Sequence, residues 1–401
     1  MTDEQRENRL LTYTLLTFLV SGASAQPLGS LIPYLRQAYG FSYDLAGVLL
    51  SFQSIGNLIA VLCGGFLSLL LGRRRSILAT SVWMAVAYAI IASGIGSPAL
   101  IVLACFMTGI ARGGNSTFSS TMISTLPGPK AVRGYNLLHG AFALGALISP
   151  LVLILCGNLW PSNGWRIMAG GLAVLVLFQL VGYLRMPIPD LPQAPAKGQK
   201  RVVDKSFLKV PEFWLGAAML FFYISTEYAI VGWMVTYFQD IGVLSADLAQ
   251  LMNSLLWLVI LIGRLLGAAI TGKVPGKKLL LVDGVGFFAF FLLMFFSRTA
   301  APIVVGIMGS GLFMATIYPT AFAFGSECIK GNDVGTSVIM FTGSIGGIIT
   351  PALVGFVAQQ AGISAGMGVV VVCIALLLLS ILLSVFTTRD KSKTEGNRSH
   401  G

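Results

Sequence analysis

Apolar side chains fill long, almost unbroken runs along the chain, and short polar stretches separate these runs. Runs of about 20 apolar residues are long enough to cross a hydrocarbon core of roughly 30 Å. Helices satisfy every backbone polar group within lipid, so the runs predict an all-α membrane protein. Twelve spans are expected, at 10–35, 44–70, 76–96, 99–125, 135–156, 166–186, 211–238, 248–271, 279–297, 301–325, 334–358 and 365–386.

A pattern of two glycines and one proline occurs twice within these apolar runs. The two copies are Gly134, Gly145, Pro150 and Gly335, Gly346, Pro351. Each residue of the second copy follows its counterpart by 201 positions (335−134, 346−145, 351−150). Matched halves in a membrane protein are typical of secondary transporters whose substrate site lies between two bundles. We therefore expect two pseudo-symmetric six-helix bundles.

One internal segment is too polar to enter a membrane. From Arg185 to Lys209 the chain is rich in Pro, Lys and Gln, the composition of an extended linker. The expected organisation is an N-terminal bundle at 1–186, a cytoplasmic basic linker at 187–210, a C-terminal bundle at 211–388 and a cytoplasmic tail at 389–401.

The distribution of charge predicts the orientation of the spans. Only 10% of residues are charged, against about 25% in soluble domains, and the net charge is +11. Of the 26 Lys and Arg residues, 21 fall in alternate loops on the side of the N-terminus. The other loops hold only Arg36, Arg166 and Arg298, while Arg112 and Arg264 lie within spans. This bias predicts an inner-membrane protein with both termini in the cytoplasm, and it explains the basic charge without a nucleic-acid partner.

The loop after the second predicted span carries a recognisable motif. Its sequence runs from Gly65 to Gly72-Arg73-Arg74, and Gly276-Lys277-Lys278 follows the eighth span in the same way. We expect a tight glycine turn at both places. The first segment resembles the signature loop of the major facilitator superfamily, which implies a gating role for Gly65, Gly72, Arg73 and Arg74. The family usually has an acidic residue where this chain has Leu69, so the resemblance does not extend to the family's usual gating contact.

Within that superfamily, the chain is most similar to fucose-permease-like sugar transporters. The likeness rests on the span that contains Tyr223, Glu227 and Trp233, on Gly263-Arg264, and on Tyr318-Pro319-Thr320. It implies transport by alternating access around a site lined by helices 1, 4, 7 and 10. Similar proton symporters carry acids in helices 1 and 4, where this chain offers Gln26, Arg112 and Asn115. Coupling through Glu227 and passive uniport both remain open.

Glu227 is the acidic residue expected deepest in the membrane. An ionisable group there is costly and should face a cavity or a partner. Glu227 could accept hydrogen bonds from a sugar, carry a coupling proton, or be a structural acid. The 201-residue offset places Gln26 opposite it, where Gln26 and Pro27 should interrupt helix 1. Arg112 could clamp an anionic substrate, pair with Glu227, or extend towards the membrane surface.

Amide and aromatic side chains supply further candidates. Three pairs share a helix face by spacing: Gln53 with Asn57, Asn136 with His139, and Asn253 with Trp257. These residue types suit a carbohydrate, although they also join helices to one another. The full set of expected substrate-binding residues is Gln26, Gln53, Asn57, Asn115, Asn136, His139, Glu227, Tyr228, Asn253, Trp257 and Tyr318.

Enzyme signatures are missing from the sequence. It contains no paired carboxylates, no metal-spaced histidines and no phosphate-binding loop. We expect a monomeric secondary transporter of a small polar solute, without metal or cofactor, whose partners are its substrate, the bilayer and, as an open question, a coupling proton. The alternatives are an exporter of amphipathic compounds, an organic anion carrier that uses Arg112, and a non-transporting receptor or enzyme, for which the linker and tails look too short.

Overall fold

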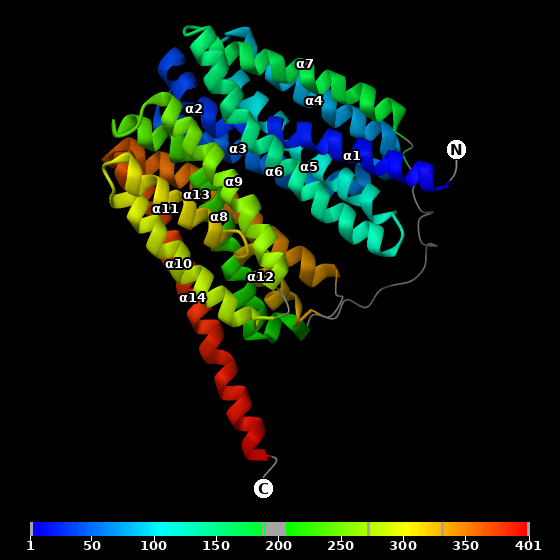
Figure 1. Ribbon diagram of the computed structural model, residues 1–401, viewed down its shortest axis with the longest axis vertical. Helices are drawn as coiled ribbons and strands as arrows, with labels where there is room; N and C mark the ends of the chain where they lie inside the picture. Colours follow the sequence, from blue (N-terminus) through cyan, green and yellow to red (C-terminus); the bar gives the residue numbers. More distant parts are fainter. Residues whose placement is uncertain (1–2, 187, 189–205, 271–272, 330–332, 399–401) are drawn as a thin grey trace. The chain divides into compact units, whose positions relative to one another are not determined.

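The computed structural model describes residues 3–398 except 187, 189–205, 271–272 and 330–332 (Figure 1). Twelve of its helical segments are long and apolar enough to cross a membrane, as the sequence predicts. The helices of the first half are α1 (Asp3–Ala25), α2 (Pro27–Tyr39), α3 (Tyr43–Leu71), α4 (Arg73–Ser93), α5 (Pro98–Ser124), α6 (Gly128–Leu159) and α7 (Gly164–Arg185). Those of the second half are η1 (Ser206–Lys209), α8 (Pro211–Asp240), α9 (Ala246–Ile270), α10 (Gly276–Phe296), α11 (Ala300–Met314), α12 (Ile317–Ser326), α13 (Asp333–Ala361) and α14 (Ile363–Arg398).

Two spans are each built from two helices. The first, Glu4–Tyr39, is interrupted between α1 and α2 at Gln26, as Pro27 predicts. The second, Ala300–Ser326, is interrupted between α11 and α12, which the sequence reading did not anticipate. Pro319 explains this break, because its ring clashes with the carbonyl group four residues earlier and it cannot donate a backbone hydrogen bond. Interrupted membrane helices commonly accompany transport sites.

Contacts divide the chain into two compact units that do not coincide with the two sequence halves. Unit 1 comprises Met1–Ala196 and Val231–Leu258, and unit 2 comprises Lys197–Ile230 and Val259–Gly401. Helices α8 and α9 therefore each contribute to both units. The bundle limits 1–186 and 211–388 remain a prediction. Most of the predicted linker lies outside the described residues, and helix α14 continues to Arg398, through most of the predicted tail.

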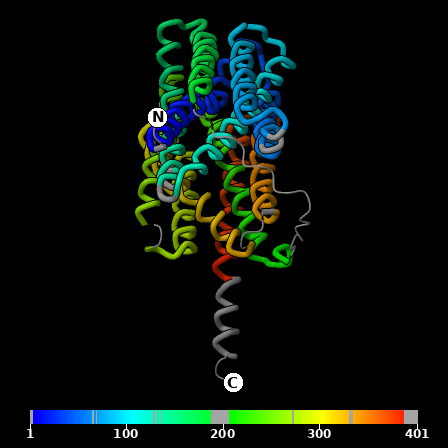
Figure 2. Tube along the Cα trace, turned by 90° about the vertical axis from the view of Figure 1, so that its right-hand side faces the viewer, coloured from blue at the N-terminus to red at the C-terminus, as the bar shows by residue number. Residues whose placement is uncertain are grey.

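Within unit 1, α1 packs on α6, α3 packs on α5, and α4 packs on α7 (Figures 1 and 2). Glycines allow the closest of these approaches. A Cβ atom at Gly145 would overlap the carbonyl oxygen of Leu19, and one at Gly22 would overlap that of Phe142. The backbones of α1 and α6 are therefore in direct contact, and no larger residue fits at Gly145 without moving one of them.

Unit 2 repeats this packing at the second copy of the glycine pattern. A Cβ atom at Gly346 of α13 would overlap the carbonyl oxygen of Phe221 of α8. Leu19 and Phe221 are thus equivalent, and they are 202 residues apart (221−19). The 201-residue offset holds for α6 and α13 but not for α1 and α8. The predicted pairing of Gln26 with Glu227 is therefore wrong by one residue: Gln26 corresponds to Tyr228, and Ala25 corresponds to Glu227.

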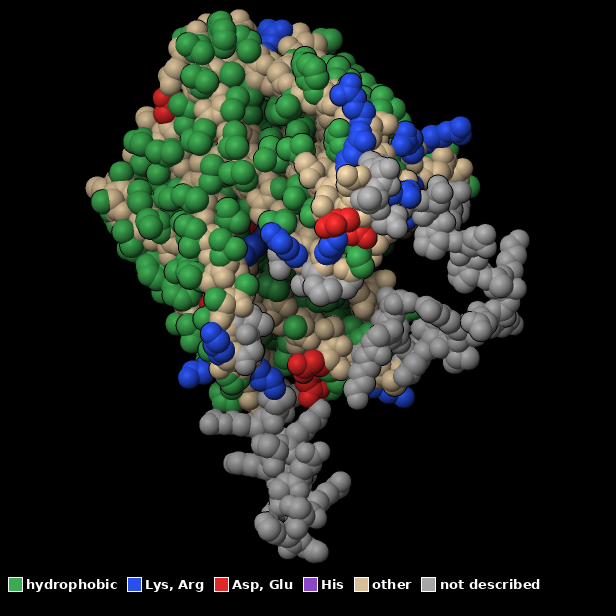
Figure 3. All heavy atoms as spheres, turned by 45° about the vertical axis from the view of Figure 1, so that its right-hand side comes forward, with side chains coloured by type: hydrophobic (Ala, Val, Ile, Leu, Met, Phe, Trp, Pro, Cys, Tyr) green, Lys and Arg blue, Asp and Glu red, His purple; other side chains and the backbone are tan. Residues whose placement is uncertain are grey.

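Apolar side chains are widely exposed, as a lipid-facing surface requires. Phe178 of α7, Leu265 of α9 and Phe296 of α10 are each at least 66% exposed. Figure 3 shows hydrophobic side chains over much of the visible face, with Lys and Arg mainly in its right-hand, central and lower parts. A water-soluble protein would bury such a surface, so lipid is the solvent that fits it.

Candidate functional site

Amide side chains join four helices in the interior of unit 1. Gln53 of α3 donates from Nε2 to the Thr108 hydroxyl at 3.1 Å and to the Ala25 carbonyl at 3.4 Å. Asn115 of α5 donates to Ser21 Oγ and accepts from Thr80 Oγ1, both at 3.3 Å. Both predicted residues are thus buried amides that hold helices together.

Gln179 of α7 extends the contacts of Asn115 and was missed by the sequence reading. Its Nε2 atom lies 2.8 Å from the Thr17 carbonyl, 3.0 Å from Tyr183 Oη and 3.3 Å from Ser21 Oγ. Ser21 is therefore shared with Asn115. A single glutamine within the apolar run of the sixth span was the available signal, because buried amides in membranes need partners.

The other candidates in unit 1 are dispersed. Gln26 is buried at the break between α1 and α2, Asn57 and Arg112 are half-buried on α3 and α5, and His139 is exposed on α6. The side chain of Asn136 lies outside the description. The four described residues come from the α1–α2 break and from three different helices.

The predicted pair on α9 is buried on one face and is extended by a third residue. Asn253 donates from Nδ2 to Ser30 Oγ at 3.0 Å, and Gln250 donates from Nε2 to the Ser30 carbonyl at 2.9 Å. The Trp257 ring meets the Phe142 ring edge-on, with 6.3 Å between centroids. Gln250 lies three residues before Asn253, so helical spacing alone could have identified it.

Unit 2 places Glu227 among aromatic and basic side chains. The rings of Tyr223 and Tyr318 lie 5.8 Å apart, and Glu227 and Arg264 act electrostatically on both hydroxyl groups. Tyr228 acts on Tyr318 in the same way. The predicted residues Glu227, Tyr228 and Tyr318 thus form one cluster. Arg264, for which the sequence suggested gating or anchoring, belongs to it as well.

Unit 2 holds a further carboxylate, Asp283, beside the break in its tenth span. Asp283 of α10 is only 6% exposed and accepts a hydrogen bond from Thr316, whereas Glu227 is half-buried. Thr316 is the residue that caps α12 at the break in the tenth span. Asp283 was overlooked because it lies close to the predicted start of its span.

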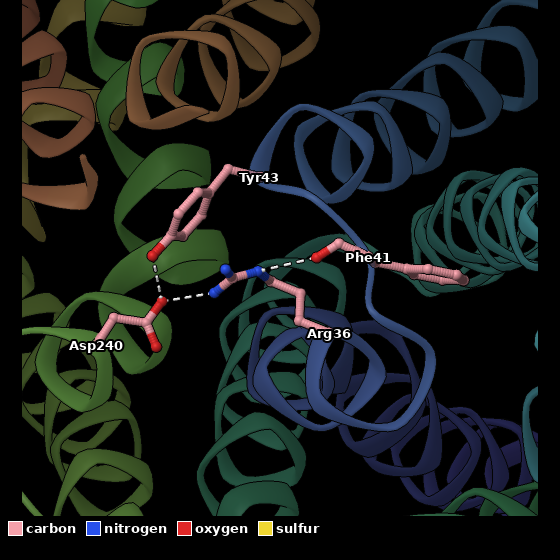
Figure 4. A network of polar contacts seen from close by, with 4 residues as sticks. All are labelled: Arg36, Phe41, Tyr43 and Asp240. Atoms are coloured by element: carbon pink, nitrogen blue, oxygen red, sulfur yellow. Dashed lines mark hydrogen bonds and ion pairs between the residues drawn. The ribbon is translucent and has the colours of Figure 1, made fainter. Parts of the chain in front are cut away.

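A charged contact joins α2 and α8 within unit 1 (Figure 4). Arg36 Nη1 lies 2.5 Å from Asp240 Oδ2, and the Tyr43 hydroxyl donates to the same oxygen at 2.7 Å. Arg36 Nε also donates to the Phe41 carbonyl at 3.3 Å, and its guanidinium group lies 3.6 Å from the centroid of the Tyr43 ring. We call Arg36, Tyr43 and Asp240 the end latch.

The predicted gating loop is ordered by basic side chains. Gly72 joins α3 to α4 at φ 80°, a left-handed conformation that favours glycine. Arg73 is buried, and Arg74 donates to the Leu184 and Met186 carbonyls at 3.1 and 3.0 Å. The expected echo at Gly276 is incomplete, because Pro275 caps α10 and Gly276 is the first residue of that helix.

Comparison with known proteins identifies the family of this chain. A profile of the Major Facilitator Superfamily matches residues 14–338. The chain is 26% identical to the glucose/mannose transporter GlcP of Bacillus subtilis over 378 residues, which cover 90% of this chain and 91% of that protein. It is 22% identical to the cis,cis-muconate transport protein of Acinetobacter baylyi over 394 residues, covering 93% and 92%.

Solved structures support the same assignment at the level of the fold. The nucleoside transporter NupG superposes with a TM-score of 0.75 at 14% identity, covering 94% of this chain and 98% of that one. The transporter FucP, in its outward conformation, gives 0.62 at 20% identity, covering 94% and 99%. Together with the profile match, these similarities establish that the chain is a multi-pass membrane transporter and belongs to the Major Facilitator Superfamily.

Proposed function

We propose that the protein transports a small uncharged solute, a sugar or sugar derivative, by alternating access in the inner membrane. The observation that carries the proposal is the Glu227 cluster, in which a carboxylate within a span lies among tyrosine hydroxyls and Arg264. Such a group can accept hydrogen bonds from solute hydroxyls and can take up a coupling proton. The similarity to GlcP supports a sugar as the solute.

The proposed orientation has both termini in the cytoplasm, following the distribution of Lys and Arg. It puts the basic loop at Arg73 and Arg74 on the cytoplasmic side and the end latch on the outer side. The sequence halves 1–186 and 211–388 would rock about the site during transport. Opening the outer side would then require the contact between Arg36 and Asp240 to break.

The test is uptake into proteoliposomes with and without an imposed proton gradient, using labelled D-glucose and D-mannose. We expect the wild type to accumulate at least one of these sugars under the gradient, and Glu227→Gln to abolish accumulation. Asp283→Asn is the matched control, because it neutralises another buried carboxylate of unit 2. Accumulation at the wild-type level by Glu227→Gln would remove the coupling role.

A second candidate is an organic anion carrier. The similarity to a cis,cis-muconate transport protein favours it, and half-buried Arg112 could hold a carboxylate. Competition decides between the two functions: excess unlabelled cis,cis-muconate should leave sugar uptake unchanged if the solute is uncharged. Loss of muconate uptake on Arg112→Gln would favour the anion carrier instead.

A further inference from the structure

Three neighbouring side chains on α9 each keep a buried polar atom without a hydrogen-bond partner. They are Gln250 Oε1, Asn253 Oδ1 and Trp257 Nε1, in residues that are 0%, 1% and 3% exposed. Spacings of three and four residues place all three on one face of the helix. Most buried polar atoms in proteins are paired, so three on one face need an explanation. All three belong to unit 1.

Ser30 of α2 determines which atoms stay unpaired. Gln250 donates from Nε2 to the Ser30 carbonyl at 2.9 Å, and a carbonyl oxygen only accepts. The orientation of this amide is therefore fixed, and Oε1 is left as a bare acceptor. Asn253 uses Nδ2 on the Ser30 hydroxyl at 3.0 Å, which leaves Oδ1 as a second acceptor. Ser30 thus holds both amides, and Tyr34 also hydrogen-bonds with Gln250, while the two amide oxygens remain without a partner.

Trp257 adds a donor and an aromatic surface at the end of this row. Its ring is packed edge-on against Phe142, so its position is fixed by packing and not by its N–H group. An indole N–H only donates. The α9 row, Gln250, Asn253 and Trp257, thus presents two acceptors and one donor beside an apolar ring.

We propose that the α9 row is a binding site for the hydroxyl groups of an uncharged polyhydroxylated solute. A hydroxyl group both donates and accepts, so it can pair with the two amide oxygens and with the indole N–H. An ionised carboxylate only accepts, so it cannot satisfy Gln250 Oε1 and would face its oxygen with like charge. This inference rests on the proposed function and deepens it, because it assigns the groups that would bind the solute hydroxyls and adds Gln250 to the site.

The first experiment measures binding to the purified full-length protein by calorimetry. The probes are D-glucose, D-mannose, D-galactose, L-fucose, D-xylose, uridine and cis,cis-muconate. We expect at least one of the six uncharged probes to bind and muconate not to bind. Gln250→Leu and Asn253→Leu should each weaken the affinity for that probe at least about 10-fold, as loss of a buried hydrogen bond does. The matched control is Ser254→Ala on the same helix, whose hydroxyl is satisfied by the Leu147 carbonyl at 2.9 Å and whose loss should change affinity less than about 2-fold.

Trp257→Phe provides a test that does not depend on the folding of the two leucine variants. It keeps an aromatic ring against Phe142 and removes the unpaired N–H group. We expect an unchanged or higher Tm without ligand, together with an affinity lowered about 3- to 10-fold. A residue that only packs would show the opposite result, a lower Tm and unchanged affinity.

Three results would overturn the proposal: unchanged affinity in both leucine variants, binding of muconate alone, or binding of none of the seven probes. The transporter proposal fails differently, since the wild type would then bind a sugar without moving it into proteoliposomes. Uptake and affinity that are unaffected by the variants would leave transport intact and reject only the α9 row.

Discussion

The pair α1–α6 in unit 1 and its counterpart α8–α13 in unit 2 share a packing geometry and differ in their chemistry. Gly145 meets the backbone of α1 at Leu19, and Gly346 meets that of α8 at Phe221. At the equivalent positions nearly two turns further on, the first span carries Ala25 and Gln26, whereas α8 carries Glu227 and Tyr228. The backbone contact is repeated while the functional groups are not.

This difference indicates that function depends on the polar residues that differ between the two halves, and not on the glycines that repeat. Unit 1 places neutral amides in its interior, where Gln53, Asn115 and Gln179 each donate hydrogen bonds to other helices. Unit 2 places carboxyl groups within its spans, at half-buried Glu227 and at buried Asp283. Neutral groups suit the recognition of an uncharged solute, whereas a titratable group suits coupling. Glycines repeat because helix contact requires them, and the polar residues are free to diverge.

The largest effect is expected from replacing the two glycines at which the paired helices touch. Gly145→Ala and Gly346→Ala each force a Cβ atom into a backbone carbonyl group, which cannot move as a flexible side chain could. We expect each change to destabilise the protein by about 1–3 kcal/mol or more and to lower the Tm measurably. Thermal unfolding followed by light scattering and fluorescence measures both variants.

Two other glycines are matched controls for these variants. Gly140 of α6 and Gly368 of α14 have open space where a Cβ atom would lie. Alanine there should leave the Tm unchanged or raise it, since alanine favours helix more than glycine. If Gly346→Ala behaves like Gly368→Ala while Gly145→Ala is disruptive, the two helix pairs are not equivalent.

Much of the fold could be predicted from the apolar runs, because lipid restricts the chain to helices of nearly fixed length. The break at Gln26 followed from Pro27, but the break before Ile317 was missed, although Pro319 supplies the same physical cause. The one-residue slip between the halves could not be read from spacing. It depends on which backbone carbonyl each glycine touches, and only coordinates show that.

The sequence could predict which residues belong to the candidate site, but not which of them contact one another. Glu227, Tyr228 and Tyr318 were identified as polar residues within apolar spans, and they do lie together. Arg264 entered the cluster because α9 brings it there. The contact between Arg36 and Asp240 spans 204 residues, and no local pattern connects them. Long-range contacts of this kind depend on how helices pack, which a single sequence does not specify.

A smaller effect is expected at the end latch, which joins the first span to its counterpart, the seventh. Asp240→Asn removes the charge that holds Arg36 and weakens the bond from Tyr43. A partly exposed ion pair with a cation–π contact is worth about 1–2 kcal/mol, or a roughly 5- to 30-fold shift between two states. The reporter is Ser30→Cys, buried in unit 1, in a variant with the five native cysteines replaced.

An impermeant thiol reagent applied from the proposed outer side should label Ser30→Cys about 5- to 30-fold faster when Asp240 is neutralised. Asp247→Asn is the control, because its carboxylate contacts only exposed Asn158, at 3.3 Å, among the hydrogen bonds described. Equal labelling rates in the Asp240 and Asp247 variants would show that the latch does not hold the outer side closed.

The smallest effect is expected at an ion pair of unit 1 whose two residues have no oppositely charged counterparts in the second half of the sequence. Lys130 Nζ lies 2.7 Å from Glu7 Oε2, while the equivalent positions by sequence are Gly331 and Lys209. The hydrogen bond that Lys130 donates to Glu7 raises the pKa of Lys130 above its ordinary value of 10.5. A raised lysine pKa means that the stabilisation is complete below pH 10.5 and is lost only as the pH rises through the pKa of the folded state.

Lys130→Met should therefore change the Tm by no more than about 1 °C, and by the same amount at pH 6 and pH 8. The change in Tm should be smaller in high salt, because the ion pair is exposed. A difference in Tm that grows between pH 6 and pH 8 would mean that another group titrates with this contact.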